Sequence, residues 1–309
     1  MTDEPIDPEV EGLLSSLSNW GRWGAEDQRG TLNHITAQTR QSALAAVRTG
    51  ETVSLSRDIS PRPSKENPSP LLHHMMVSGD GAPNRGLGIA ADWLGLAFHG
   101  YAVTHLDSLS HLFWNRQGYN GRAASDVSTA SGAAWGSVEV AKHGIVTRGV
   151  LLDLAGARGQ AWLEPGEGLT PVDLERAERD QGVTVGQGDL LLIHTGRDAR
   201  SAAKGPVHPD HDGVAGLHHS CLGFLQERQV AVAASDSVTD VLPSGVDGFT
   251  MPIHTVALVA MGLWLIDNAY LDELSRRCRA RGSWEFLAAV APLLLKRSTG
   301  SPVNPIAIL

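Results

Sequence analysis

The sequence predicts an α/β domain, because short apolar strands alternate with amphipathic helices in the second half of the chain. Three buried strands are predicted at 148–154, 189–195 and 230–236. Between the first two strands, Thr170 is placed as a helix N-cap, Pro171 as the first helical residue and Asp173 as the acid of a capping box. A second helix is expected at 215–227. Strands separated by helices in this way are typical of α/β domains.

The remaining elements are predicted in chain order. The polar, helical residues 1–50 form an N-terminal extension of one domain spanning 1–309, with a helix at 37–48 that Gly50 ends. A half-buried strand at 51–59 precedes a Pro-rich loop at 60–70 and a Gly-rich, mobile segment at 79–88, which we expect to lie over a site or at a subunit contact. The further elements are a buried strand at 94–104, a helix at 252–262, a strand at 263–267, a helix at 270–280 and one or two strands at 284–297.

Composition narrows the class of protein. The 309 residues include 34 Asp and Glu against 25 Lys and Arg, and 42% are hydrophobic, which excludes a disordered chain. An acidic chain without a basic run is not expected to bind nucleic acid or an anionic membrane surface. Cys221 and Cys278 are too few for a disulfide framework or a Cys-based zinc finger. We find no signal peptide and no apolar run near the roughly 20 residues that a bilayer requires, so a cytoplasmic protein acting on a small molecule is expected.

The densest group of chemically useful residues is Thr104-His105-Leu106-Asp107-Ser108-Leu109-Ser110-His111. His105 and Asp107 directly follow an apolar run, and on a strand residues i and i+2 point to the same face. Imidazole and carboxylate together suit Zn²⁺, Mn²⁺ or Fe²⁺. If the chain turns after Asp107, His111 returns over the same strand end and serves as a base without ligating the metal. A core histidine bonded to Asp107 is the alternative interpretation of the pair.

This segment resembles the HxGTHxDxxxH signature of the metal-dependent cyclase-family hydrolases, which include kynurenine formamidase and isatin hydrolase. Other segments extend the resemblance over nearly the whole chain: Trp20–Gly24, Gly30–Asn33, Tyr119–Gly121, Leu191–Gly196, Ala234–Asp236, Pro252–His254 and Gly300–Leu309. The resemblance implies a mixed β-sheet core with flanking helices. It also implies a divalent metal ion, Zn or Mn, and a homodimer or homotetramer in which an N-terminal segment crosses over the neighbour.

The resemblance also implies roles for single residues. His105 and Asp107 match two metal ligands of the family, and His111 matches its catalytic base. His254 matches a histidine near the metal that either ligates a second ion or carries a proton. Asp267 stands where the shorter members of the family have a ligating glutamate.

The chain departs from the signature at two places. Tyr101 occupies the position of the first histidine, and Val103-Thr104 replaces Gly-Thr. His99 could supply the missing ligand, but on a straight strand it would lie about 20 Å from His105, so a sharp bend at Gly100 would be needed. His218, ahead of the neighbouring His219, is the other candidate donor. Tyr101 itself could ligate the metal or bond a substrate carbonyl.

Further candidates surround this centre. Thr104 or a backbone N–H would stabilise an oxyanion, and Trp23 and Trp114, with Trp20, could form an aromatic wall for the substrate. Asp236 and Asp240 either orient ligand histidines or cap helices. His73 and His74, in a predicted loop, could line the entrance, and a surface role is the simpler interpretation. His208 and His211 are expected to be loop residues.

These observations predict a metal-dependent hydrolase that opens an amide, lactam or lactone bond of a small, possibly aromatic substrate with a metal-activated water. A non-hydrolytic cyclase or dehydratase on the same fold is one alternative. A catalytically degraded binding protein is another, because Tyr101 stands where the family has a ligand. Kynurenine formamidase activity itself is not favoured, since the site differs and the chain is longer than the short members.

Overall fold

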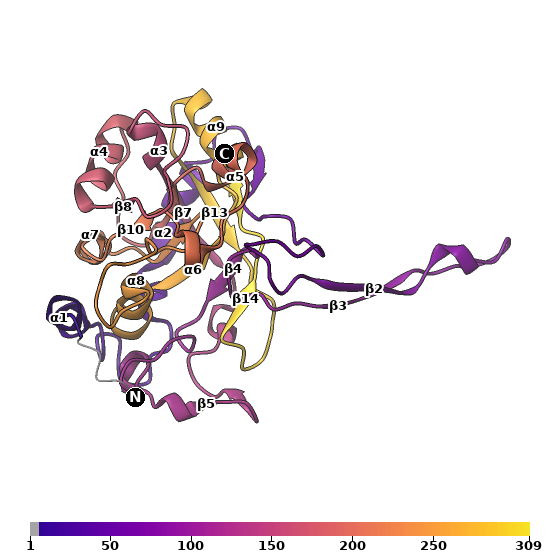
Figure 1. Ribbon diagram of the computed structural model, residues 1–309, viewed down its shortest axis with the longest axis horizontal. Coiled ribbons are helices and arrows are strands. Elements are labelled where there is room, and N and C mark those ends of the chain that lie inside the picture. The colour runs from indigo at the N-terminus through magenta and orange to yellow at the C-terminus, as the bar shows by residue number, and fades with distance from the viewer. Residues whose placement is uncertain (1–5) are drawn as a thin grey trace.

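A mixed β-sheet forms the centre of the molecule (Figure 1). The computed structural model describes residues 6–309, so residues 1–5 of the predicted N-terminal extension lie outside the described part. Within it, nine strands run in the order β1-β15-β13-β7-β9-β11-β12-β4-β14. Their bounds are Thr52–Ser54, Ile306–Ile308, Glu285–Val290, Ile145–Asp153, Leu190–His194, Val232–Ser235, Trp264–Asp267, His105–Asp107 and Gly300–Pro302.

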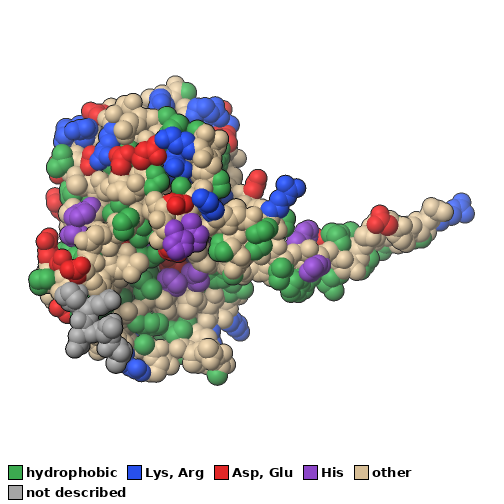
Figure 2. Space-filling model, viewed as in Figure 1, with side chains coloured by type: hydrophobic (Ala, Val, Ile, Leu, Met, Phe, Trp, Pro, Cys, Tyr) green, Lys and Arg blue, Asp and Glu red, His purple; other side chains and the backbone are tan. Residues whose placement is uncertain are grey.

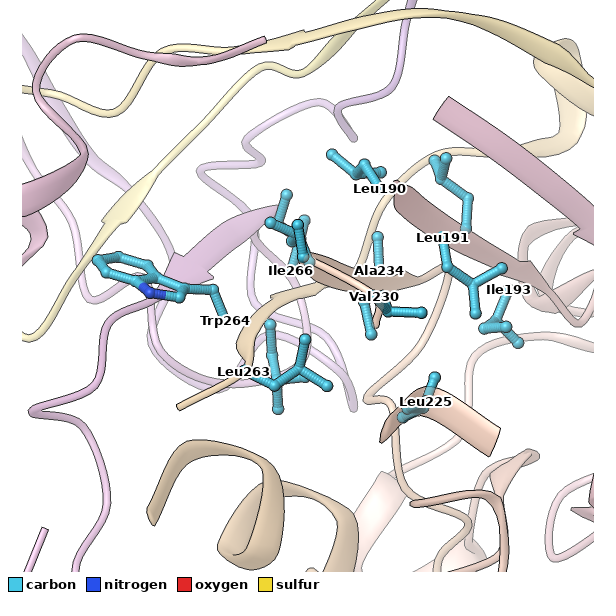
Figure 3. Close-up of a cluster of buried hydrophobic side chains, with 14 of the residues drawn as sticks. Leu190, Leu191, Ile193, Leu225, Val230, Ala234, Leu263, Trp264 and Ile266 are labelled. Atoms are coloured by element: carbon cyan, nitrogen blue, oxygen red, sulfur yellow. The ribbon is translucent and has the colours of Figure 1, made fainter. Parts of the chain in front are cut away.

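The four central strands β7, β9, β11 and β12 are parallel. They match the predicted strands at 148–154, 189–195, 230–236 and 263–267, and the predicted α/β class with a mixed sheet is confirmed. Their side chains are almost all buried, as expected for parallel strands covered on both faces. Figure 3 shows the resulting core, in which Leu190 and Leu191 of β9, Ala234 of β11 and Ile266 of β12 lie together.

Helices connect and cover these strands. Their bounds are α1 Pro8–Ser16, η1 Gly30–His34, α2 Ala37–Ala45, η2 Gly79–Gly81, η3 Tyr119–Gly121, η4 Ala124–Asp126, η5 Val138–Ala141, α3 Leu154–Ala157, α4 Pro171–Gln181, α5 Arg197–Lys204, α6 Pro209–Asp212, α7 Cys221–Glu227, α8 Pro252–Thr255, η6 Val256–Met261 and α9 Asp272–Arg281. The predicted capping box of α4 is present, with the Thr170 backbone N–H donating to Asp173 at 2.9 Å. The predicted helix at 252–262 begins as α8 and continues as a π-helix, η6. No helix of residues 6–309 is long and apolar enough to cross a membrane.

The N-terminal segment is fixed to the core by a close approach of two glycines. A Cβ on Gly30 would lie 2.0 Å from the Gly262 carbonyl oxygen, so only glycine fits there. The backbone N–H of Thr31 donates to the same Gly262 oxygen at 2.9 Å. The hydroxyl of Thr31 donates to the carbonyl of Ala231, just before β11, at 2.7 Å. The segment therefore joins the domain at the amino ends of its central strands.

A long two-stranded arm projects from the body (Figure 1). It consists of β2 (Leu72–Val77) and β3 (Ala91–Gly95), joined by the Gly-rich segment. Two predictions are wrong here. The strand expected at 94–104 does not form, because β3 ends at Gly95 and Gly100 takes a φ of 136° that breaks an extended run. His73 and His74 lie in strand β2 rather than in a loop.

Three small sheets complete the fold, of which the arm is one. The others pair β5 (Val127–Ser128) with β6 (Gly132–Ala133) and β8 (Gly168–Leu169) with β10 (Gly216–Leu217). The predicted helix at 215–227 therefore begins as strand β10, and its helical part starts only at Cys221. The predicted strand at 51–59 is shortened to β1, and the following Pro-rich stretch 60–70 contains no helix or strand, as predicted.

Candidate metal centre

Backbone pairing in the sheet assembles the centre. Strand β4 inserts between β12 and β14, antiparallel to both, and places His105 directly opposite Asp267. His105 and Asp107 stand two residues apart on β4, so their side chains share a face of the sheet. All three residues are buried, with at most 2% of their surface exposed. Sheet register alone therefore gathers an imidazole and two carboxylates in an interior where bare charges are costly.

Two groups of donor atoms meet at Asp107. Within each group, one atom from every residue lies within 4.8 Å of the others: His99, His105 and Asp107 form one group, and Asp107, His254 and Asp267 form the other. Asp107 Oδ1 lies 3.6 Å from His105 Nε2, and Asp107 Oδ2 lies 3.7 Å from His254 Nε2. Three imidazoles and two carboxylates are a donor set that suits a transition-metal dication.

Two buried atoms in the first group have no hydrogen-bond partner. His99 Nδ1 and Asp107 Oδ1 are only 2.9 Å apart, yet their orientation does not form a hydrogen bond, and neither atom has another partner. Buried polar atoms are almost always paired, because an unpaired one costs about 1–3 kcal/mol. Two ligand atoms of one metal ion lie close together in the same way, because each bonds the ion and not the other atom. The donor set therefore fits a bound cation.

The bend at Gly100 brings His99 to this group. Its ring lies 5.2 Å from that of His105, and its Nε2 lies 3.1 Å from the hydroxyl of Thr299, the residue before β14. The chain thus bends at Gly100, as His99 needs in order to reach the same group of donors as His105. The side chain of Tyr101 turns away, and its hydroxyl donates to Asp210 instead. Burial, with this bond to Asp210, raises the pKa of Tyr101, so its phenol stays protonated.

His254 is held between two carboxylates. Its Nδ1 lies 2.5 Å from Asp240 Oδ2, and its Nε2 lies 3.0 Å from Asp267 Oδ2. Burial would lower the pKa of His254, but Asp267 and Asp240 outweigh it and raise the pKa well above 6.5. Asp107 behaves in the opposite way: burial would raise its pKa, and His111 and His105 lower it well below the ordinary value. Asp107 therefore stays ionised among these imidazoles.

His111 lies beside the donor atoms and is more open to solvent. Its Nε2 is 3.9 Å from Asp107 Oδ1, and its ring stacks on that of His99 at 4.0 Å. About a quarter of its side chain is exposed. Burial lowers the pKa of His111 to about 4, with Asp107 opposing and His99 assisting the shift. The ring is therefore neutral near pH 7 and able to accept a proton.

Other predicted site residues lie apart from the donor groups. The hydroxyl of Thr104 is buried and donates to the carbonyl of Asn268 at 2.6 Å. The Trp23 ring packs edge-on against His34, whose Nδ1 contacts Gln187 just before the amino end of β9. His218 bonds Ser220 and is not among the residues of either group. Trp114, in contrast, follows His111 closely and stacks on Phe249 at 4.4 Å.

The weaker histidine candidates lie at the surface. His73 and His74 stand on the exposed arm, where His74 stacks on Trp93. The rings of His208 and His211 lie 4.3 Å apart at α6, and Asp210 between them receives the Tyr101 hydroxyl. Figure 2 shows histidine side chains near the middle of the body and on the part of the arm nearest to it.

Sequence reasoning missed Thr299, Phe249 and Arg197. Arg197 is buried and donates to the carbonyl of Tyr101 and to Asn268 Oδ1, which fixes the bend beside the donor groups. No local motif marks these residues, because each reaches the centre through pairing between distant segments. Asp236, weighed as an orienting carboxylate, accepts the backbone N–H groups of Thr195, Gly196 and Arg197 at the start of α5.

Comparison with known proteins identifies the family of the chain. The chain belongs to the Cyclase family, whose model, described as "Putative cyclase", matches residues 30–239. A solved novel cyclase is 29% identical, with a TM-score of 0.87 over 99% of this chain and 100% of that one. Isatin hydrolase A from Labrenzia aggregata, bound to benzyl benzoate, is 22% identical, with a TM-score of 0.60 over 86% and 95%. A "potential metal-dependent hydrolase with cyclase activity" is 12% identical, with a TM-score of 0.52 over 84% and 98%.

No curated protein sequence matches the chain. The family match confirms the resemblance seen in the sequence, and the solved structures confirm the cyclase-family fold. The family is one of enzymes with hydrolase relatives. The likeness to a metal-dependent hydrolase and the two groups of residues that could hold a metal together support a divalent metal ion as cofactor.

Proposed function

We propose that the protein is a metal-dependent hydrolase that opens an amide, lactam or lactone bond of a small aromatic substrate. The observation that carries the proposal is the pair of unpartnered buried atoms, His99 Nδ1 and Asp107 Oδ1, in a group of three donors. Isatin hydrolase, a relative in fold, has by its name a cyclic amide substrate. The family and the donor chemistry together favour hydrolysis of a C–N bond.

Zinc or manganese would be held by His99, His105 and Asp107, and a second ion by Asp107, His254 and Asp267. When bound, such a cation lowers the pKa of water and polarises a carbonyl group. His105 is oriented for this by its own backbone, because its Nδ1 lies 2.8 Å from the Val103 carbonyl and must carry the proton, leaving Nε2 free. Tyr101 is not needed as a ligand, because His99 takes that place.

His111 would take the proton from the attacking water and pass it to the leaving nitrogen or oxygen. Its neutral ring and partial exposure suit a group that must face both donors and substrate. With only the first ion bound, His254, held between its two carboxylates, would instead be a second proton donor. Thr104 would position the backbone rather than stabilise an oxyanion, since its hydroxyl is committed to Asn268.

The stacked rings of Trp114 and Phe249 would form an aromatic wall, and Trp114 follows His111 by three residues in the chain. A cavity of about 490 Å³ lies against Phe249, Asp210 and the loop 242–250. Its volume suits a small aromatic molecule. We therefore place substrate binding at Trp114 and not at Trp23, which lies toward the other end of the sheet. Tyr101, through Asp210, would form part of the rim.

We also propose that the arm binds a second copy of the chain. It exposes Leu72, Met75, Met76, Val77, Leu87, Ile89, Trp93 and Leu94, each by 43–87%. A two-stranded hairpin is at best marginally stable alone, and covering eight such side chains at about 100 Å² each would bury roughly the 800 Å² per partner of a standard interface. Replacing Met76 and Leu94 with Ser should convert dimers or tetramers to monomers in light scattering. An unchanged mass would contradict this role.

A cytoplasmic location is proposed on the two cysteines. Cys221 and Cys278 are both buried and free, as is usual in a reducing compartment.

The first test is metal content by elemental mass spectrometry on protein purified without chelator or added metal. One or two equivalents of zinc or manganese per chain are expected. No metal before or after reconstitution would contradict the proposal. Loaded protein should then be screened on amides, lactams and lactones, with product mass increased by one water.

The variant His111→Ala tests the proton acceptor. It should keep its metal and lose on the order of 10²–10⁴-fold in turnover. His143→Ala is a control, because it removes an exposed histidine that belongs to neither donor group. A His111→Ala enzyme that keeps near-wild-type turnover would show that another group is the base.

A further inference from the structure

Two consecutive residues, Thr239 and Asp240, contact two of the three donors in the second group. Asp240 is fully buried and accepts the Ile253 N–H at 2.6 Å and the His254 N–H at 3.1 Å. Its Oδ2 also lies 2.5 Å from His254 Nδ1. Thr239 donates to Asp267 Oδ1 through its hydroxyl at 3.0 Å and through its backbone N–H at 3.2 Å. Asp240 thus contacts Nδ1 of His254, and Thr239 contacts Oδ1 of Asp267. The other atoms of the two side chains lie toward the centre: His254 Nε2 is 3.7 Å from Asp107 Oδ2, and Asp267 Oδ2 is 3.0 Å from His254 Nε2.

The backbone of this dipeptide is itself fixed. The Leu217 N–H donates to the Thr239 carbonyl at 2.8 Å, and the Val241 N–H donates to the Leu217 carbonyl at 3.1 Å. Gly216 packs so closely that a Cβ there would lie 2.3 Å from the Asp240 carbonyl oxygen. Helix capping alone would use only the backbone donors of α8. The additional contact with the His254 ring links the same carboxylate to the donor atom.

We infer that Thr239 and Asp240 are the positioning residues that select which atoms of His254 and Asp267 face the cation. The inference deepens the proposed function and rests on it. Both Asp240 oxygens accept backbone N–H groups, so the contact of Oδ2 with His254 Nδ1 requires a proton on Nδ1 and leaves Nε2 to act as the ligand. Thr239 occupies Asp267 Oδ1, so Oδ2, the oxygen 3.0 Å from His254 Nε2, is left to the cation.

The test uses Asp240→Asn in the full chain, with zinc alone as the probe. The amide has the same shape and can still accept the Ile253 N–H. Its NH₂ group then faces Nδ1 and favours the opposite ring tautomer, with the proton on Nε2. We expect zinc affinity, measured by competition with a chromophoric chelator, to fall about 10–100-fold. The ¹⁵N shift of His254 should report a protonated Nδ1 in the wild type and an unprotonated one in the variant.

Asp153→Asn is the matched control, because Asp153 also bonds a histidine Nδ1, that of His194, outside the two donor groups. It should leave zinc affinity unchanged. Thr239→Val, with Thr239→Ser as the conservative rescue, gives a second measurement should Asp240→Asn fail to fold. Thr239→Val should weaken zinc binding and Thr239→Ser should restore it.

Equal zinc affinity in wild type and Asp240→Asn, with Nδ1 protonated in both, would overturn the inference. Equal affinity in wild type and Thr239→Val would overturn the role of Thr239. If the wild type binds no divalent cation, the proposed function fails, and the ¹⁵N shifts then decide the role of Asp240 separately. The same Nδ1 state in both proteins would refute that role, and the expected difference would support it.

Discussion

Two buried clusters of histidine and carboxylate lie in the same sheet, and they differ in how their atoms are paired. In the candidate metal centre, His99 Nδ1 and Asp107 Oδ1 have no hydrogen-bond partner. In the second cluster, at the carboxyl ends of β7 and β9, His194 bonds Asp153 through Nδ1 at 3.0 Å and Asp272 through Nε2 at 2.9 Å.

His194, Asp236 and Asp272 are also close enough to form a group of metal donors, so residue type does not distinguish the two clusters. Pairing does. Asp153 receives further bonds from Ser275 and Arg279, and Asp236 is occupied by the backbone at α5. A cluster whose donors are all paired connects elements of the fold, whereas one with unpaired donors is prepared for a ligand.

The largest effect should follow from Asp107→Asn, because Asp107 belongs to both donor groups. Metal content should fall below half an equivalent, and turnover should fall by on the order of 10³-fold or more, the loss of several kcal/mol of stabilisation. The midpoint of thermal unfolding in metal-free protein at pH 7 should fall, because the neighbouring histidines lower the pKa of Asp107 and its ionised form therefore stabilises the fold. Elemental analysis measures the metal content, and calorimetry measures the midpoint of unfolding. Retained metal would place the centre elsewhere.

His194→Gln should have the opposite profile. It leaves Asp272 without its imidazolium partner and Asp153 with Arg279 as its remaining cation. Breaking a buried pair of this kind costs up to about 3–5 kcal/mol of unfolding free energy. Metal content should not change. Urea denaturation gives the free energy, and a loss below about 1 kcal/mol would contradict the structural role of this cluster.

The pH dependence should sharpen the contrast. Burial would lower the pKa of His194, but its bonds to Asp153 and Asp272 prevail and raise it from 6.5 to about 10. A raised pKa stabilises the fold fully below pH 6.5, and that stabilisation is lost as pH rises toward 10. The difference in unfolding free energy between wild type and His194→Gln should therefore shrink over this window. A constant difference would show that the ring does not stabilise the fold as a cation.

Sequence reasoning predicted what is local. The parallel strands, the capping box at Thr170, and the placement of His105 and Asp107 on one strand face follow from short patterns of residues. The expected straight strand at 94–104 is wrong, because apolar composition alone cannot show that Leu94 belongs to an exposed arm. The approach of His99 depends on a single backbone angle at Gly100 and on Thr299 from a distant strand. Such long-range contacts leave no periodic signal in the sequence.

The three-residue strand β4 has a further consequence for how the protein folds. Its neighbours β12 and β14 come from the last third of the chain. Closing such long loops is entropically costly and slow, so these contacts are expected to form late. The second donor group, which joins Asp107 to His254 and Asp267, then exists only in the completed fold, and an ion that binds it has no comparable site on the unfolded chain. Because the ion binds only the folded protein, the free energy of unfolding should rise as the concentration of free ion exceeds its dissociation constant.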